Sequence, residues 1–126
     1  MGIRFAQAHD LRVAIKSSGH DYLGRSTAKN SLLFWTAYLK DIAFTEQFIV
    51  GGSDHGPAVT VGSGVGVETL YAAAKAQGKM FVGGVGAGTV SPAGGYIQGA
   101  GHSAFSPIYG LGADNVLRRC FNLTCL

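Results

Sequence analysis

The segment of residues 17–26 places the strongest constraint on how this chain can fold. It carries three serines, two glycines, a histidine, an aspartate and an arginine, and it separates two apolar runs at residues 12–16 and 31–36. Both runs are typical of strands, because the first alternates in polarity and the second is rich in β-forming residues. A loop so rich in backbone donors and charge can bring its main chain close to an anionic ligand. The sequence therefore predicts an anion-binding loop between two strands.

The rest of the chain mixes helical and extended patterns. Residues 67–77 predict a helix, because Val67, Leu70, Tyr71 and Ala74 share one face and Gly78 follows as a stop signal. The other expected elements are a helix end at residues 3–9, strands at residues 46–50 and 58–62 joined as a hairpin through a turn cluster at 51–57, a short strand at 80–82 and the start of a last strand at 113–117. The segment at residues 39–44 is ambiguous. This mixture predicts an α/β or α+β domain.

Residues 83–112 are glycine-rich and carry few charges, and no long element fits them. The chain has 20 glycines in 126 residues, which is more than twice the usual share. One interpretation is a loose surface loop. The other is a functional segment, which we favour because a loop of about 30 residues without structure is uncommon inside a compact domain.

Composition and charge argue against several classes of protein. The net charge is +3 but the basic residues form no stripe, so we expect no nucleic-acid partner. We also expect no membrane partner, because no run of about 20 apolar residues is present. The first residues lack the apolar core of a signal peptide, and the localisation is left open. Cys120 and Cys125 have poor spacing for zinc, and two free thiols are favoured over a disulfide.

Common catalytic motifs are not supported. Gly64 and Gly66 begin a dinucleotide-type fingerprint, but Thr69 stands where the third glycine is needed, and no Walker sequence is present. A hydrolase triad built on His20 or His102 lacks a nucleophile elbow. A metal site from His20, Asp21, His102 and Asp114 lacks recognised ligand spacing. Taken singly, His20 also fits a loop histidine bonded to the backbone, and Asp21 and Arg25 fit a simple ion pair.

Five ordered blocks give a more specific indication, at residues 15–26, 31–36, 56–62, 93–103 and 109–116. In this order the chain resembles the flavin-binding domain of the vanillyl-alcohol oxidase / p-cresol methylhydroxylase superfamily. Within it, the chain is most similar to the fungal berberine-bridge-enzyme-like, isoamyl-alcohol-oxidase-like branch. The resemblance implies a partial FAD-binding domain of the p-cresol methylhydroxylase type over residues 1–117, followed by a tail outside the family pattern at residues 118–126. We expect the chain to be truncated relative to the family.

The resemblance also implies a cofactor, FAD, and the residues that hold it. The 17–26 loop would hold the pyrophosphate through backbone amides, and His20 would be bonded covalently to a methyl group of the flavin ring. No catalytic or metal-ligating residue is implied. The implied FAD-binding residues are Ser17, Ser18, Gly19, His20, Asp21, Arg25, Ser26, Gly94, Gly95, Gly99, Gly101, His102, Asp114 and Asn115.

Two departures from the family pattern affect this site. Ala87 stands at the position of the cysteine that forms a second flavin bond in many relatives, so a cysteinyl link is not expected. Ala100 adds a methyl group where the family has a run of glycines before the histidine, so we expect crowding there.

The function implied by the resemblance is an FAD-linked oxidoreductase. It would oxidise a small molecule, namely an alcohol, a sugar or a related secondary metabolite, with oxygen as the electron acceptor. The substrate domain of the family is missing, so we expect the isolated chain to be inactive. Family members are often secreted. The alternatives are a non-catalytic truncated product of a decayed or mis-spliced oxidase gene, and a small glycine-rich interaction protein.

Overall fold

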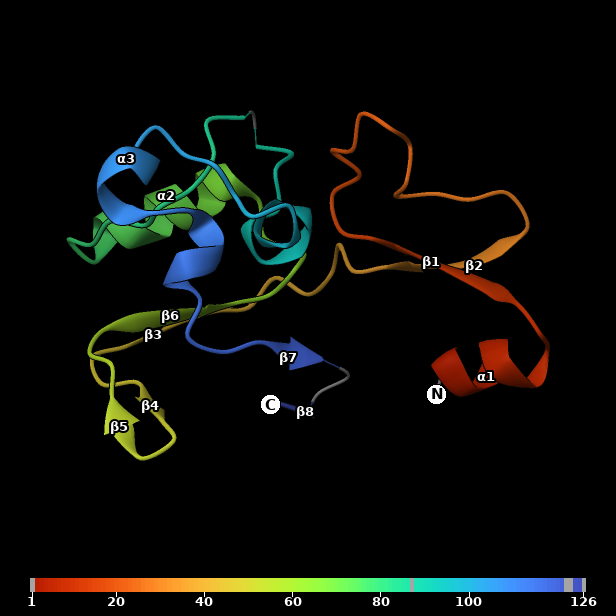
Figure 1. Cartoon of the computed structure of the whole chain (residues 1–126), viewed down its shortest axis with the longest axis horizontal. Coiled ribbons are helices and arrows are strands. Elements are labelled where there is room, and N and C mark those ends of the chain that lie inside the picture. The colour runs from red at the N-terminus through yellow and green to blue at the C-terminus, as the bar shows by residue number, and fades with distance from the viewer. Residues whose placement is uncertain (1, 87, 122–123, 126) are drawn as a thin grey trace.

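A computed structural model describes residues 2–86, 88–121 and 124–125. Helix α1 (Gly2–Ala8) and strands β1 (Arg12–Lys16) and β2 (Ser31–Trp35) lie at one end of the long axis, and most of the remaining chain lies at the other end (Figure 1). The mixture of helices and strands confirms the predicted fold class.

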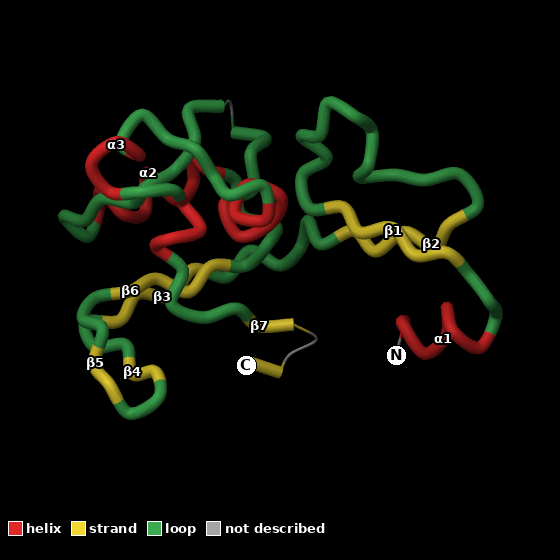
Figure 2. The backbone as a smooth tube through the Cα atoms, in the orientation of Figure 1, coloured by secondary structure: helices red, strands yellow, loops and turns green. Residues whose placement is uncertain are grey.

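Strands β1 and β2 are parallel, with Arg12 opposite Ser31 and Lys16 opposite Trp35. Both were predicted from the sequence, as was the end of α1. Because the strands run in the same direction, the chain between them must cross back along the sheet, and it does so as a long irregular connection that contains the 17–26 loop (Figure 2). The loop therefore begins at the carboxyl end of a parallel strand, where open α/β sheets commonly bind ligands.

The predicted hairpin between residues 46–50 and 58–62 is wrong. Strand β6 (Ala58–Val61) pairs antiparallel with β3 (Ile42–Thr45), whereas β4 (Ile49–Val50) turns back on β5 (Ser53–Asp54). Gly51 and Gly52 both have positive φ, at 58° and 83°. Two successive residues with positive φ form a tight turn whose twist matches that of a short hairpin. Strand β4 therefore pairs with β5 directly after the turn, and β6 pairs with β3.

Helix α2 (Val67–Ala76) confirms the helix predicted at this place. Val67, Leu70 and Ala74 are buried on one face, and Gly78 follows with a φ of 63°. On the same helix, the Tyr71 hydroxyl donates to the carbonyl oxygen of Gly84 at 2.8 Å. The helix thus fixes the beginning of the glycine-rich segment.

The glycine-rich residues contain only short turns: η1 (Pro92–Tyr96), α3 (Ser106–Tyr109) and η2 (Gly112–Asn115). Several of their backbone positions are nevertheless buried, among them Gly83, Gly84, Gly94, Gly101 and Gly112. This segment is therefore packed against the molecule, and the interpretation as a loose surface loop is wrong.

Two further strand predictions are wrong. Residues 80–82 form no strand, because an alternating pattern needs a hydrogen-bonded neighbour and no described strand pairs with them. Residues 113–117 begin in η2, where the Asp114 carboxylate accepts the N–H of Leu111 at 2.8 Å and the Asn115 amide donates to the carbonyl oxygen of Leu111 at 2.8 Å. Such short polar side chains compete with a strand by bonding to nearby backbone.

The tail forms β7 (Cys120–Phe121) and β8 (Thr124–Cys125), an antiparallel pair. The side chains of Cys120 and Cys125 lie outside the described part of the structure, so their predicted thiol state stays a prediction. The division of the chain at residue 117 also stays a prediction.

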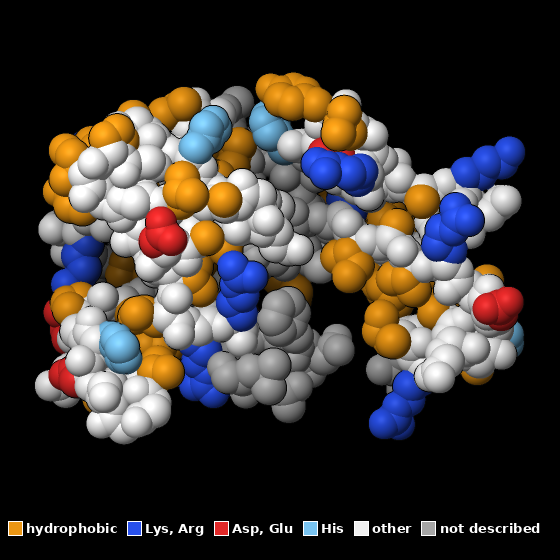
Figure 3. Space-filling model, viewed as in Figure 1, with side chains coloured by type: hydrophobic (Ala, Val, Ile, Leu, Met, Phe, Trp, Pro, Cys, Tyr) orange, Lys and Arg blue, Asp and Glu red, His pale blue; other side chains and the backbone are white. Residues whose placement is uncertain are grey.

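The core is small: its largest buried side chains lie in and just before α2, and two buried alanines lie in α1 and β1 at the other end of the molecule. Its buried apolar residues are Ala6, Ala14, Val65, Val67, Leu70 and Ala74. Large apolar side chains reach the surface elsewhere, including those of Tyr22 and Leu23 on the 17–26 loop (Figure 3).

Candidate functional site

A cavity of about 1220 Å³ lies between the 17–26 loop and residues 84–102. The structure brings most of the predicted cofactor-binding residues together around it. Those that line it are Ser17, Ser18, Gly19, His20, Asp21, Arg25, Ser26, Gly94, Gly95, Gly99, Gly101 and His102. The two sides of the cavity come from stretches far apart in the sequence, so the fold itself creates the site.

Gly94 marks a close approach between the two sides. A Cβ at this position would lie 2.6 Å from the Ser91 Oγ and would also collide with the Ser17 Oγ. Ser91 itself is buried, and its hydroxyl donates to the carbonyl oxygen of Ser63 at 2.7 Å. The second side of the cavity is therefore anchored beside the start of α2, and it leaves room for Ser17 only because residue 94 has no side chain.

An ion pair between Asp21 and Arg25 links two positions within the 17–26 loop. The guanidinium Nη2 lies 2.7 Å from the Asp21 Oδ1, and the backbone N–H of Arg25 also donates to this carboxylate. The side-chain hydrogen bond from Arg25 is the main reason why the pKa of Asp21 falls to about 2. The ion pair considered from the sequence is thus present, and it offsets the carboxylate charge in a loop predicted to hold an anion.

The beginning of the loop presents backbone donors. Gly19 has a φ of +86°, and the N–H of His20 donates to the Ser18 Oγ at 3.3 Å. Within the described residues, the N–H groups of Ser18 and Gly19 donate to no protein acceptor. Both residues line the cavity, so these two amides are candidates for contacts with phosphate oxygens.

The side chain of His20 is exposed to the cavity and contacts Thr89, which belongs to the segment on the other side of the cavity. Its Nδ1 lies 3.0 Å from the Thr89 Oγ1, and its ring centroid lies 5.7 Å from that of Tyr22. The ring is therefore bonded to a side chain, not to the backbone as the simpler interpretation suggested. Thr89 fixes the orientation of the imidazole within the cavity.

Tyr96 shapes the far side of the cavity and was not predicted. Its hydroxyl lies 2.9 Å from the carbonyl oxygen of Gly101 and 3.1 Å from that of His102. Burial raises the pKa of Tyr96, so the hydroxyl stays neutral and able to donate. A Cβ added at Gly101 or at Gly112 would lie 2.7 Å from the Tyr96 ring, so these glycines leave space for it.

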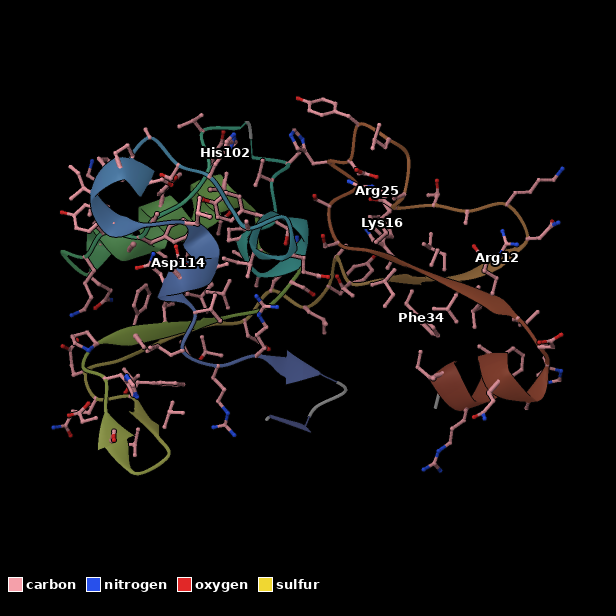
Figure 4. The ribbon with its side chains drawn as sticks, viewed as in Figure 1. Arg12, Lys16, Arg25, Phe34, His102 and Asp114 are labelled. Carbon is pink, nitrogen blue, oxygen red and sulfur yellow. The ribbon has the colours of Figure 1, made fainter. Side chains whose placement is uncertain are left out.

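The remaining predicted features lie away from this cavity or outside the described residues. Asp114 and Asn115 do not line the cavity: Asp114 is tied to Leu111, and Asn115 borders a second cavity of about 1620 Å³. Figure 4 shows Asp114 on η2, apart from His102. Ala87 lies outside the described residues. Ala100 has a φ of 69°, in the region that favours glycine, so its methyl group costs backbone strain. The residue is exposed, and the expected crowding of the site stays a prediction.

Thr89 and Ser91 were also missed. A serine and a threonine in a glycine-rich run carry no periodic signal, and their partners lie 69 and 28 residues away in the chain. Neither residue lies in the five blocks that carry the resemblance.

Two negative findings concern the described residues alone. They contain no group of three histidine, cysteine, aspartate or glutamate side chains placed to hold a metal ion. None of the helices they form is long and apolar enough to cross a membrane.

Comparison with known proteins gives consistent matches. A family model described as an FAD binding domain matches residues 2–119. An FAD-linked oxidoreductase of Aspergillus clavatus, patO, is 48% identical over 115 residues, which cover 91% of this chain and 20% of the relative. A VAO-type flavoprotein oxidase of Thermothelomyces thermophilus, VAO615, is 45% identical and is covered to the same extent.

A crystal structure of the VAO-type flavoprotein MtVAO615 from Myceliophthora thermophila has the same fold over this region. It superimposes with a TM-score of 0.85 at 44% sequence identity, covering 93% of this chain and 21% of that one. The chain therefore spans about a fifth of the length of the relatives it matches.

Proposed function

Because this chain belongs to the FAD-binding domain family of the VAO-type FAD-linked oxidoreductases, we propose that the cavity beside the 17–26 loop is its FAD site. The observation that carries the proposal is the close approach of Ser17 to Gly94, which joins two glycine-rich stretches around one cavity.

The residues of the cavity suit this cofactor. Its volume of about 1220 Å³ exceeds the roughly 300–1,000 Å³ of pockets for drug-sized ligands, as a dinucleotide requires. The amides of Ser18 and Gly19 can donate to the pyrophosphate, and Arg25, paired with Asp21, neutralises the carboxylate that would otherwise repel the anion. Gly95 and Gly99 add no side chain to the opposite wall, which Val90, Tyr96 and Gln98 also line.

We further propose that His20 tethers the cofactor. Its imidazole is exposed on the cavity and is oriented by Thr89. With FAD bound, the imidazole of His20 would give up its N–H proton and form a C–N bond in place of one C–H bond of the flavin methyl group. The two electrons and two protons released would reduce oxygen to hydrogen peroxide.

A separate proposal concerns the substrate and the electron acceptor of the reaction. We propose that the substrate is a small alcohol, a sugar or a related secondary metabolite, and that oxygen is the acceptor. Bound FAD would supply the capacity to accept a hydride from a substrate carbon. One relative is named as a flavoprotein oxidase, which supports oxygen as the electron acceptor. Because the chain matches only about a fifth of these relatives, we propose that turnover needs residues beyond the matched region. The sequence identity to FAD-linked oxidoreductases favours a flavin-binding protein over a small interaction protein without flavin.

The tether is tested on the whole chain after it has been incubated with FAD in air. We expect flavin fluorescence to stay in the pellet after acid precipitation, and we expect the His20→Ala variant to lose it. The His55→Ala variant is the matched control, because His55 is exposed and does not line the cavity, so its loss should leave the tether intact. Flavin retained in the pellet of His20→Ala, or absent from that of the unmodified chain, would contradict the proposed tether.

A further inference from the structure

The start of the 17–26 loop is held by the end of a neighbouring strand. The indole Nε1–H of Trp35 donates to the carbonyl oxygen of Ser17 at 3.0 Å. Next to it, the N–H of Thr36 donates to the carbonyl oxygen of Lys16 at 2.9 Å. Figure 4 shows Lys16 where β1 runs into the loop. Two successive carbonyl groups at the entry to the loop are therefore fixed from β2.

Trp35 is itself held in place. The Lys16 Nζ lies 5.2 Å from the centre of the indole ring, a cation–π distance, and the Tyr38 ring packs edge-on at 6.2 Å. Trp35 also lies opposite Lys16 in the parallel register. These contacts orient the indole N–H toward Ser17, on a side chain that is 55% exposed.

The hydrogen bond from Trp35 also sets the direction of the next amide. The Ser17 carbonyl and the Ser18 N–H belong to one planar trans peptide, so they point in opposite directions. Ser17 and Ser18 line the cavity, whereas Trp35 is not among the described residues that do. Holding the Ser17 oxygen toward Trp35 therefore turns the Ser18 N–H away from Trp35. If this peptide flipped, a carbonyl oxygen would face the anion instead.

We infer that Trp35 is a positioning residue of the anion-binding loop: its indole N–H holds the Ser17–Ser18 peptide so that the Ser18 N–H faces a bound pyrophosphate. The inference rests on the proposed function, in which the loop receives the pyrophosphate of FAD. It assigns a role to a side chain that lies outside the cavity and does not itself contact the ligand.

The test compares ligands with and without a pyrophosphate. In the Trp35→Phe variant the aromatic ring is kept and the N–H is lost. We expect this variant to bind ADP and FAD roughly three- to tenfold more weakly than the unmodified chain, as the loss of one oriented hydrogen bond implies. Riboflavin, which has no phosphate, should bind equally to both. In Tyr38→Phe, the matched control on the neighbouring ring, all three ligands should bind as in the unmodified chain.

The outcomes separate this inference from the proposed function. Failure of the unmodified chain to bind FAD contradicts the proposed function, and the inference with it. Binding of ADP to Trp35→Phe at unchanged affinity overturns the inference alone. An equal loss of ADP and riboflavin binding also overturns it, since that indicates a general disturbance of the fold.

A second measurement needs no variant. Trp35 is the single tryptophan of the chain, so it gives one indole N–H signal in a nitrogen-15 spectrum. We expect this signal to exchange slowly with deuterated water and to shift together with the Ser18 amide when ADP is added. An indole that exchanges as fast as a free one, or that ignores ADP while the Ser18 amide shifts, overturns the inference.

Discussion

At Gly94 a single added methyl group should disturb the site. In the Gly94→Ala variant the new Cβ would collide with the hydroxyl groups of Ser17 and Ser91, and Ser91 cannot easily yield because it is buried and bonded to Ser63. We expect a loss of about 1–3 kcal/mol in the free energy of unfolding, the usual cost of overpacking. Urea denaturation measures it.

Gly95 provides the control for this variant. No atom lies within 4 Å of a Cβ built at this glycine, so Gly95→Ala should change stability by less than about 0.5 kcal/mol. Equal stability of the two variants would contradict the close approach that joins the two sides of the cavity.

Asp21 predicts how the loop responds to acid. Its folded-state pKa is about 2, below the ordinary value of 3.8, because Arg25 donates hydrogen bonds to the ionised carboxylate. A lowered pKa means that the contribution to stability is fully present above about pH 4 and is lost as the pH falls toward 2. Carbon-13 NMR of the side-chain carboxyl should give a midpoint near 2.

The Arg25→Gln variant tests the cause of this shift. Without the guanidinium the midpoint of Asp21 should rise toward 3.8. A midpoint that is the same with and without Arg25 would show that the ion pair does not form in solution.

How far the site could be predicted from the sequence depends on the kind of residue. The 17–26 loop was found because a cradle for an anion needs those residue types, whereas the glycines after Val90 were assigned to the site only through the family resemblance. Thr89 and Trp35 were missed because each acts through one hydrogen bond to a distant residue, which leaves no local pattern. Asp114 and Asn115 were expected at the same cavity, but both side chains bond to nearby backbone groups.

Among the elements, α2 carries the largest share of the described buried apolar residues, namely Val67, Leu70 and Ala74. Leu70 is 1% exposed on its inner face, so Leu70→Ala should cost about 2–5 kcal/mol in the free energy of unfolding. Leu23→Ala removes the same atoms from a side chain that is 78% exposed, and it should leave stability nearly unchanged. Thermal unfolding followed by circular dichroism measures both, and similar midpoints for the two variants would contradict the burial of Leu70 in α2.

The elements that could be predicted are those with a local period. Helix α2 follows its apolar pattern closely, because the pattern matches the face that the structure buries. Strands β1 and β2 form where their β-forming residues predicted them, although Ile15 and Trp35 are 63% and 55% exposed and no residue of β2 is buried. A local apolar pattern does not predict the pairing of β6 with β3, because this pairing depends on the direction that the turn at Gly51 and Gly52 gives to the chain. The apolar sequence of residues 80–82 likewise does not decide whether they form a strand, because a strand needs a hydrogen-bonded partner.

For the whole molecule, the arrangement of two parts explains how so small a core can support a large cavity. The parallel pair β1–β2 presents the 17–26 loop from one part, and α2 holds the glycine-rich segment on the other (Figure 1). The apolar surface seen in Figure 3 is consistent with a chain that matches about a fifth of its relatives. The match over residues 2–119 accounts for nearly all of the described chain.

The central claim is that this chain holds FAD in the cavity between the 17–26 loop and residues 84–102. Titration of the whole unmodified chain with FAD, followed by flavin fluorescence and calorimetry, tests it most directly. We predict saturable binding of one FAD per chain that ADP competes away, because the loop recognises the pyrophosphate. A titration that stays linear to millimolar FAD, or binding that ADP leaves untouched, would contradict the claim.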